Sequence, residues 1–287
     1  MATAGMLSLV GASTMAPYAP SYGFAGSCRS ALEVGGDLFD VVPLGENSTL
    51  LVMADVMGKG LPASLFAASL RTLVRALAKP GGRPLEWLTE LNDLMFEQLS
   101  NEDVFITAQL VLADFLNHEL RVANAGHCPL LISDGVHRTR AIAPEGMPLG
   151  IQRYTAFSEE RVRLQPFSST LLYTDGVTEA RDDTGSFFGQ ARLEQWLHGS
   201  VANGYNSVEL KQSLLQELVE FQGTSSPADD QTFLILCDET PRSAGLLGGD
   251  DLQWSLQRMA APTERQDTFP DQIGALVPAL EAQFRAA

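Results

Sequence analysis

Aspartates recur in four short segments of this 287-residue chain, each beside a glycine or a second acidic residue. Asp55 and Asp175 close the apolar runs LLVMAD and TLLYTD, where a buried strand would emerge from a sheet. Each segment alone predicts only a turn, because an aspartate side chain bonds the local backbone and glycine accepts positive φ. The segments contain Gly36, Asp37 and Asp40; Asp55 and Val56; Asp175 and Gly176; and Asp229 and Asp230.

Taken together, the four segments favour a metal centre. Several carboxylates at one sheet end would repel one another, and their pKa values would rise or the side chains would move apart. A divalent cation removes that repulsion, and an all-oxygen ligand set favours Mg²⁺ or Mn²⁺ over zinc. The three cysteines and four histidines have no zinc spacing. We interpret the cysteines as reduced thiols and His127 as a turn residue, with a role as ligand or acid as its alternative.

Other chemistries lack their sequence patterns. The segment Gly58-Lys59-Gly60 is not a phosphate-binding loop, because the required glycine spacing and the following Ser or Thr are missing. There is no Gly-x-Ser-x-Gly segment of the kind that serine hydrolases use.

The bulk composition limits the partners of the chain. Its net charge of −16 disfavours nucleic acid and anionic membranes, which carry the same sign. A hydrophobic content of 45% suits a globular protein with a sizeable core. No apolar run reaches the roughly 20 residues of a membrane span, and no positive charge precedes the apolar stretch at the N-terminus. We therefore expect a cytoplasmic protein.

The hydrophobic pattern predicts strands first, then two helices, more strands, two further helices and a last strand. This order is not a strict βαβ alternation, so we predict an α+β fold in which helices cover antiparallel sheets. Residues 134–168 are expected to be mainly loop. The predicted strands cover 21–28, 38–44, 49–57, 105–113, 119–123, 129–133, 169–173 and 232–237, and the predicted helices cover 62–78, 84–99, 190–198 and 207–221.

Composition also suggests the domain boundaries. Residues 1–20 are rich in Ala, Ser and Pro and are predicted to be a flexible leader. Residues 21–238 are expected to form one domain. Residues 239–252 are predicted to be a linker, and the stretch up to residue 287 is an extension too short for a core of its own.

Six motifs in a fixed order give the chain a family resemblance. Between Tyr22 and Cys237 it resembles the SpoIIE/RsbU branch of the PPM-type serine/threonine phosphatases. Departures are small: Phe39 stands where tyrosine is common, and Ser30 where proline is usual. The motifs are VGGDLFD, ADVMGKGLPASL, VANAGHCPLLI, GMPLGI, LLYTDGVTEARDDTG and DDQTFLIL.

The resemblance implies an αββα sandwich with a dinuclear metal site at one end. Two Mn²⁺ or Mg²⁺ ions would activate a water for attack on the phosphate, so that no protein nucleophile is needed. Asp55 would bridge both ions, Asp37 and the Val56 carbonyl would complete one site, and Asp175 and Asp229 the other. Four further residues are weaker candidates for the site than these ligands: Gly36, Asp40, Gly176 and Asp230.

By the same resemblance, the substrate would be a phosphorylated anti-sigma-factor antagonist of the STAS type in bacterial partner-switching signalling. The resemblance also allows for an upstream sensor or activator and for a homodimer. The helices within residues 62–99 would then be either a switch that alters metal occupancy or plain core. Two alternatives stay open: a noncatalytic module of the same fold that sequesters a signalling partner, and a metal-dependent nuclease or nucleotide hydrolase.

Overall fold

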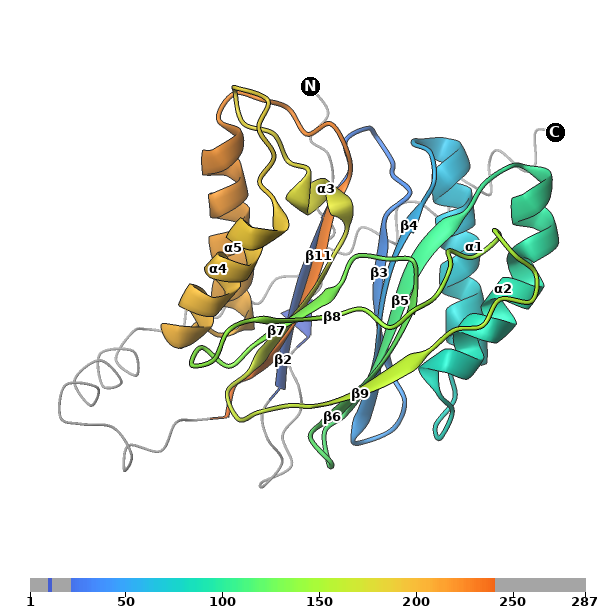
Figure 1. Cartoon of the computed structure of the whole chain (residues 1–287), viewed down its shortest axis with the longest axis horizontal. Coiled ribbons are helices and arrows are strands. Elements are labelled where there is room, and N and C mark those ends of the chain that lie inside the picture. Colours follow the sequence, from blue (N-terminus) through green and yellow to red (C-terminus); the bar gives the residue numbers. More distant parts are fainter. Residues whose placement is uncertain (1–9, 12–21, 241–287) are drawn as a thin grey trace, which may run out of the picture. The chain divides into compact units, whose positions relative to one another are not determined.

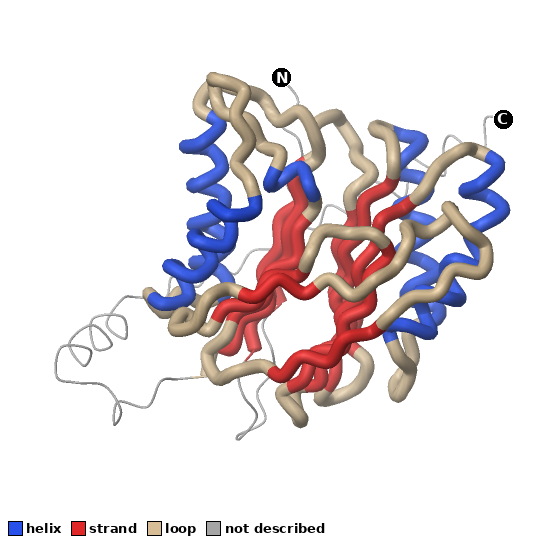
Figure 2. Tube along the Cα trace, viewed as in Figure 1, coloured by secondary structure: helices blue, strands red, loops and turns tan. Residues whose placement is uncertain are grey.

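The computed structural model describes residues 10–11 and 22–240. In this part, two antiparallel sheets lie face to face, and helices cover the outer face of each sheet (Figures 1 and 2). One sheet has the strand order β1-β2-β11-β10-β7-β8, and the other has the order β3-β4-β5-β6-β9. The α+β prediction and its αββα arrangement are confirmed.

The strands of the first sheet come from both ends and the middle of the chain. They are β1 (Val10–Gly11), β2 (Tyr22–Arg29), β7 (Leu130–Ser133), β8 (Arg140–Ile142), β10 (Ser169–Tyr173) and β11 (Gln231–Asp238). The second sheet is more local in sequence. Its strands are β3 (Leu38–Pro43), β4 (Ser48–Val56), β5 (Ile106–Asp114), β6 (Glu119–Ala125) and β9 (Glu159–Arg163).

The central strands are apolar on both faces because both faces are covered. In β4, Leu50 and Val52 point into the cluster beneath the helices, whereas Leu51 and Met53 point into the cluster between the sheets. All four side chains are completely buried. This two-sided burial explains why the β4 segment is a continuous apolar run rather than an alternating one.

Two long helices pack on the second sheet. α1 (Leu61–Leu77) has a proline in its first turn, and α2 (Pro84–Asn101) begins with one. The buried positions of α1 recur at three- and four-residue steps, which places one stripe against the sheet. These positions are Ala63, Ala67, Leu70 and Val74.

The first sheet is covered by α4 (Gln190–Ala202) and α5 (Ser207–Gln222). At the start of α5, Asn206 accepts from the Glu209 N–H while the Glu209 side chain accepts from the Asn206 N–H, which is a capping box. A single helical turn, α3 (Asp175–Thr178), follows β10 directly.

Residues 134–168 are mainly loop, as predicted, but they also contain two short strands, β8 and β9, which the sequence analysis did not predict. Strand β9 has the sequence EERVR, pairs only with β6, and exposes most of its side chains. An edge strand of this kind keeps its charges in water and buries one apolar residue, Val162. Its sequence therefore lacks the apolar pattern on which the prediction depended.

The domain boundaries stay predictions. Val10–Gly11 of the predicted leader pair with Ala25 and Phe24 of β2, and the rest of residues 1–20 lie outside the described part. The chain divides into the units Met1–Thr240 and Pro241–Ala287. The predicted extension beyond residue 240 also lies outside the described residues.

Candidate metal centre

Strand pairing in the second sheet brings Asp37 next to Asp55. Asp37 directly precedes β3, and Asp55 is the last residue but one of β4. Because Leu38 pairs with Ala54, the two aspartates are neighbours at the same end of this sheet. Burial, followed by the negative charge of Asp55, raises the pKa of Asp37 well above its ordinary value.

The first sheet contributes Asp175 and Asp229 in the same way. Asp175 begins α3 two residues after the end of β10, and Asp229 lies just before β11. Because Tyr173 at the end of β10 pairs with Phe233 near the start of β11, both acids lie at one end of that sheet. Burial and then the charges of Glu179 and Asp229 raise the pKa of Asp175.

Interactions between the sheets join the two pairs of aspartates. The Thr174 hydroxyl donates to Asp37 Oδ2 at 2.8 Å, which links the end of β10 to the start of β3. Burial, followed by the charges of Asp175 and Asp229, raises the pKa of Asp55 to about 7. The structure therefore brings Asp37, Asp55, Asp175 and Asp229 together at one end of the sandwich, within electrostatic reach of one another.

Asp230 positions the loop that carries Asp37. Its carboxylate is buried and accepts from the backbone N–H of Ala31 at 2.8 Å and of Gly36 at 2.9 Å. A Cβ at Gly35 would overlap this carboxylate. These contacts give Asp230 a positioning role, with both carboxylate oxygens engaged by the loop.

Two of the glycines are required by close backbone approaches. A Cβ at Gly36 would lie 2.7 Å from the Val56 carbonyl oxygen, so this carbonyl and the Asp37 loop are in direct contact. A Cβ at Gly176 would overlap the carbonyl oxygen of Asp230. Gly36 and Gly176 thus let the backbone segments that bear the acids converge.

Asp40 has different partners. Its carboxylate accepts from Arg75 Nε at 2.6 Å, Arg75 Nη2 at 2.7 Å and Arg71 Nε at 3.1 Å. Both arginines belong to α1. Asp40 therefore attaches β3 to the helix that covers it, and the structure does not bring it to the other aspartates.

Sequence reasoning did not identify Lys59 or Thr174 as parts of the site. Lys59 Nζ lies 3.0 Å from Asp229 Oδ1 and donates to the Ala228 carbonyl oxygen at 2.6 Å. Lys59 stands four residues after Asp55, and Thr174 stands directly before Asp175. Their closeness to these aspartates in sequence was the one feature that could have suggested a place in the site. Their contacts join residues more than 130 positions apart in sequence, which no local pattern reveals.

His127 is a turn residue, as predicted. It follows Gly126, whose φ of 67° closes the turn, and its N–H donates to Asn124 Oδ1 at 2.7 Å. Burial lowers the pKa of His127 to about 4, so the ring is neutral at pH 7. The adjacent Cys128 is a free thiol whose pKa is raised to about 12 by burial and then by the nearby carboxylates. The thiol is therefore protonated at pH 7 in the metal-free site.

The residues at this end of the sandwich suit hard cations in their chemistry. As the side chains lie, no three His, Cys, Asp or Glu residues in the described part form a group that could hold a metal ion. The donors are nevertheless all oxygens, and burial, followed by the charges of neighbouring carboxylates, raises the pKa values of Asp37, Asp55 and Asp175. A divalent cation would relieve this repulsion, so the donor set fits Mg²⁺ or Mn²⁺.

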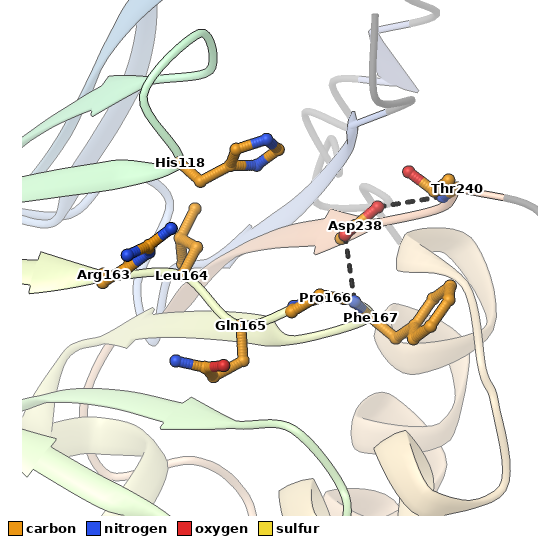
Figure 3. A pocket seen from close by; sticks show the side chains of 8 residues that line it. All are labelled: His118, Arg163, Leu164, Gln165, Pro166, Phe167, Asp238 and Thr240. Atoms are coloured by element: carbon orange, nitrogen blue, oxygen red, sulfur yellow. Dashed lines mark hydrogen bonds between the residues drawn. The ribbon is translucent and has the colours of Figure 1, made fainter.

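A separate cavity of about 400 Å³ lies away from the aspartates (Figure 3). It is lined by Asp238, at the far end of β11 from Asp230, and by His118 and the segment 163–167. The Asp238 carboxylate accepts from the N–H groups of Phe167 and Thr240, both at 2.9 Å. None of the predicted site residues lines this cavity.

In the described part of the chain, no helix is both long enough and apolar enough to cross a membrane.

The fold matches solved phosphatase structures. The chain is similar to the SiaA-PP2C domain of Pseudomonas aeruginosa, with a TM-score of 0.65 and 24% identity over 75% of this chain and 85% of that one. It is also similar to RsbX, whose crystal structure is a complex with magnesium, with a TM-score of 0.59 and 16% identity over 80% of this chain and 99% of that one. At these identities the likeness establishes the PP2C fold.

Similarity in sequence extends to two characterised proteins. Protein IcfG of Synechocystis sp. is 30% identical over 235 residues, which cover 72% of this chain and 36% of IcfG. Phosphoserine phosphatase RsbU of Bacillus subtilis is 26% identical over 207 residues, which cover 72% of this chain and 60% of RsbU. The chain thus spans from about a third to three fifths of the length of these relatives.

A family model agrees with the resemblance seen in the motifs. The model described as Stage II sporulation protein E (SpoIIE) matches residues 45–237, which are more than half of the chain. This stretch includes Asp55, Asp175 and Asp229, and Asp37 lies eight residues before it. The chain belongs to the SpoIIE family.

Proposed function

We propose that this chain is a metal-dependent protein serine/threonine phosphatase. The observation that carries the proposal is the convergence of Asp37, Asp55, Asp175 and Asp229, from both sheets, at one end of a PP2C fold. The name of its relative RsbU, a phosphoserine phosphatase, supports the same reaction. The substrate we propose is a phosphoserine or phosphothreonine on an anti-sigma-factor antagonist of the STAS type.

The side chains have distinct tasks in this proposal. Asp37, Asp55 and the Val56 carbonyl would hold one Mn²⁺ or Mg²⁺ ion, and Asp55, Asp175 and Asp229 would hold the other. Such ions supply an activated water and neutralise the charge of the phosphate. Thr174 fixes the Asp37 carboxylate through its 2.8 Å hydrogen bond.

The arrangement of the acids also suits the entry of cations before the substrate. Asp175 is exposed and the Asp229 side chain is 48% exposed, whereas Asp37 and Asp55 are only partly exposed. A phosphorylated side chain is an anion and would be repelled by uncompensated carboxylates. The protein should therefore bind phosphate esters only after divalent cations have reduced the negative charge of the site.

Removal of one carboxylate tests the proposal. We expect Asp55→Asn and Asp175→Asn each to lower the Mn²⁺-dependent hydrolysis of p-nitrophenyl phosphate and of a phosphorylated STAS-type protein at least about 100-fold. The exposed Asp93→Asn on α2 is the matched control and should keep full activity. Circular dichroism and thermal unfolding of each variant would establish that the fold is retained.

The outcomes separate the competing functions. Near-normal activity of Asp175→Asn would overturn the metal-centre assignment. A wild-type protein that binds a STAS-type partner but hydrolyses neither substrate in Mn²⁺ would indicate a noncatalytic binding module. Hydrolysis of p-nitrophenyl phosphate without hydrolysis of the phosphoprotein would overturn the substrate proposal and leave the reaction type intact.

A further inference from the structure

Lys59 is positioned at the candidate metal centre by the loop between β4 and α1. It lies between Gly58 and Gly60, whose φ angles are 105° and 72°, a backbone region that favours glycine. From this loop its ammonium group reaches the segment just before β11, at Asp229 Oδ1 and the Ala228 carbonyl oxygen. The Lys59 side chain is 45% exposed, so it lies at the solvent side of the site.

The four aspartates are unequally compensated by positive charge. Asp229 forms an ion pair with Lys59 at 3.0 Å. Across residues 22–240, no lysine or arginine forms an ion pair with Asp37 or Asp55, nor with Asp175. One half of the centre therefore carries a tethered cation, and the half formed by Asp37 and Asp55 does not.

We propose that Lys59 is a positioning residue that competes with the divalent cation bound by Asp175 and Asp229, and that it thereby sets how tightly this second ion is bound. The inference rests on the proposed function, because it assumes two cations at this centre. The first cation would then enter the Asp37–Asp55 half, where no basic side chain opposes it.

The competition has a direct geometric basis. Asp229 Oδ1 already accepts from Lys59 Nζ and from the N–H of Asp230 at 2.9 Å. A divalent ion on the same oxygen would have to displace the ammonium group. An ion on the other carboxylate oxygen would remain close to it and be repelled. In either case, the second ion binds more weakly than it would at a centre without Lys59.

Charge removal at this position should tighten metal binding. We expect Lys59→Gln to lower the Kd of the weaker Mn²⁺ step about two- to fivefold, which is the range for partly exposed ion pairs. Lys59→Arg keeps the charge and should stay close to wild type. Lys79→Gln removes the same charge from an exposed position after α1 and controls for the change in net charge.

The measurement is Mn²⁺ binding, by isothermal titration calorimetry and by electron paramagnetic resonance of the free ion, independent of turnover. A second ion bound by Lys59→Gln but not by wild type would also support the inference. Unchanged or weaker Mn²⁺ binding by Lys59→Gln, with two ions bound by wild type, would overturn it and leave the proposed function standing. Absence of any Mn²⁺ binding by wild type would overturn both.

Discussion

At the scale of single residues, the two neighbouring acids Asp229 and Asp230 differ in what they contact. Asp230 is 7% exposed and uses both carboxylate oxygens on the loop that carries Asp37. The Asp229 side chain is 48% exposed and faces Lys59. These adjacent aspartates therefore have different roles. Asp230 holds the loop that carries Asp37, whereas Asp229 has a partly exposed carboxylate beside Lys59.

This difference predicts that two matched substitutions affect different properties, stability in one case and Mn²⁺ binding in the other. Asp230→Asn replaces one acceptor oxygen by an NH₂ group that faces a backbone donor, so the free energy of unfolding should fall by about 1–3 kcal/mol. Asp229→Asn should change it by less than about 1 kcal/mol while weakening Mn²⁺ binding. Urea unfolding of both metal-free variants measures the contrast. Equal stability of Asp230→Asn and wild type would show that the loop does not depend on this carboxylate.

At the scale of elements, the attachment of α1 to β3 depends on a buried carboxylate. The Asp40 side chain is 2% exposed, and it receives hydrogen bonds from two arginines that are about half exposed. Burial alone would raise the pKa of Asp40, but the hydrogen bonds from Arg75 and Arg71 outweigh it and leave that pKa below its ordinary value. The ionised form of Asp40 therefore stabilises the contact between helix and sheet.

A specific pH dependence follows from the lowered pKa of Asp40. The stabilising contribution is present above the unfolded-state pKa of about 3.9 and is lost as the pH falls through the lower, folded-state value. Asp40→Asn should reduce the free energy of unfolding at pH 7 by about 1–3 kcal/mol and remove this part of the acid sensitivity below about pH 4. Chemical denaturation between pH 2.5 and 7 measures both effects.

The control for this prediction is Glu97→Gln. Glu97 pairs with Arg153 at 2.8 Å, and both side chains are well exposed. Its loss should change the free energy of unfolding by less than about 1 kcal/mol. If Asp40→Asn and Glu97→Gln lowered the free energy of unfolding by the same small amount, the buried carboxylate of Asp40 would not be important for the attachment of α1.

Most elements were predictable from sequence because their apolar pattern reflects burial. The predicted helix at 84–99 corresponds to α2 (Pro84–Asn101), and the predicted strand at 169–173 to β10. Strand β9 was not predictable, since it has one apolar residue and obtains its conformation from pairing with β6. The positioning role of Asp230 was hidden for a similar reason, because its partners lie 194 and 199 residues away.

At the scale of the whole described domain, metal binding at the proposed centre should stabilise the fold. Cations that bind the folded chain but not the unfolded one should raise the free energy of unfolding by about 2.7 kcal/mol at 100 times the Kd. We expect Mn²⁺ to raise the Tm and a chelator to reverse this rise. Asp55→Asn should show little response to either. A Tm of the wild-type protein that is independent of Mn²⁺ would contradict this coupling.

The order of the strands has a consequence for how the protein is made. Strand β2 pairs along its whole length with β11, from Gln231 opposite Arg29 to Asp238 opposite Tyr22. While the chain is still being translated, the partner of β2 has not been synthesised, and an edge of this strand stays open to wrong pairing. Completion of the sheet must await the synthesis of β11, whose residues lie more than 200 positions after their partners in β2. A nascent chain stalled before Gln231 would therefore lack β11, the strand that lies between β2 and β10.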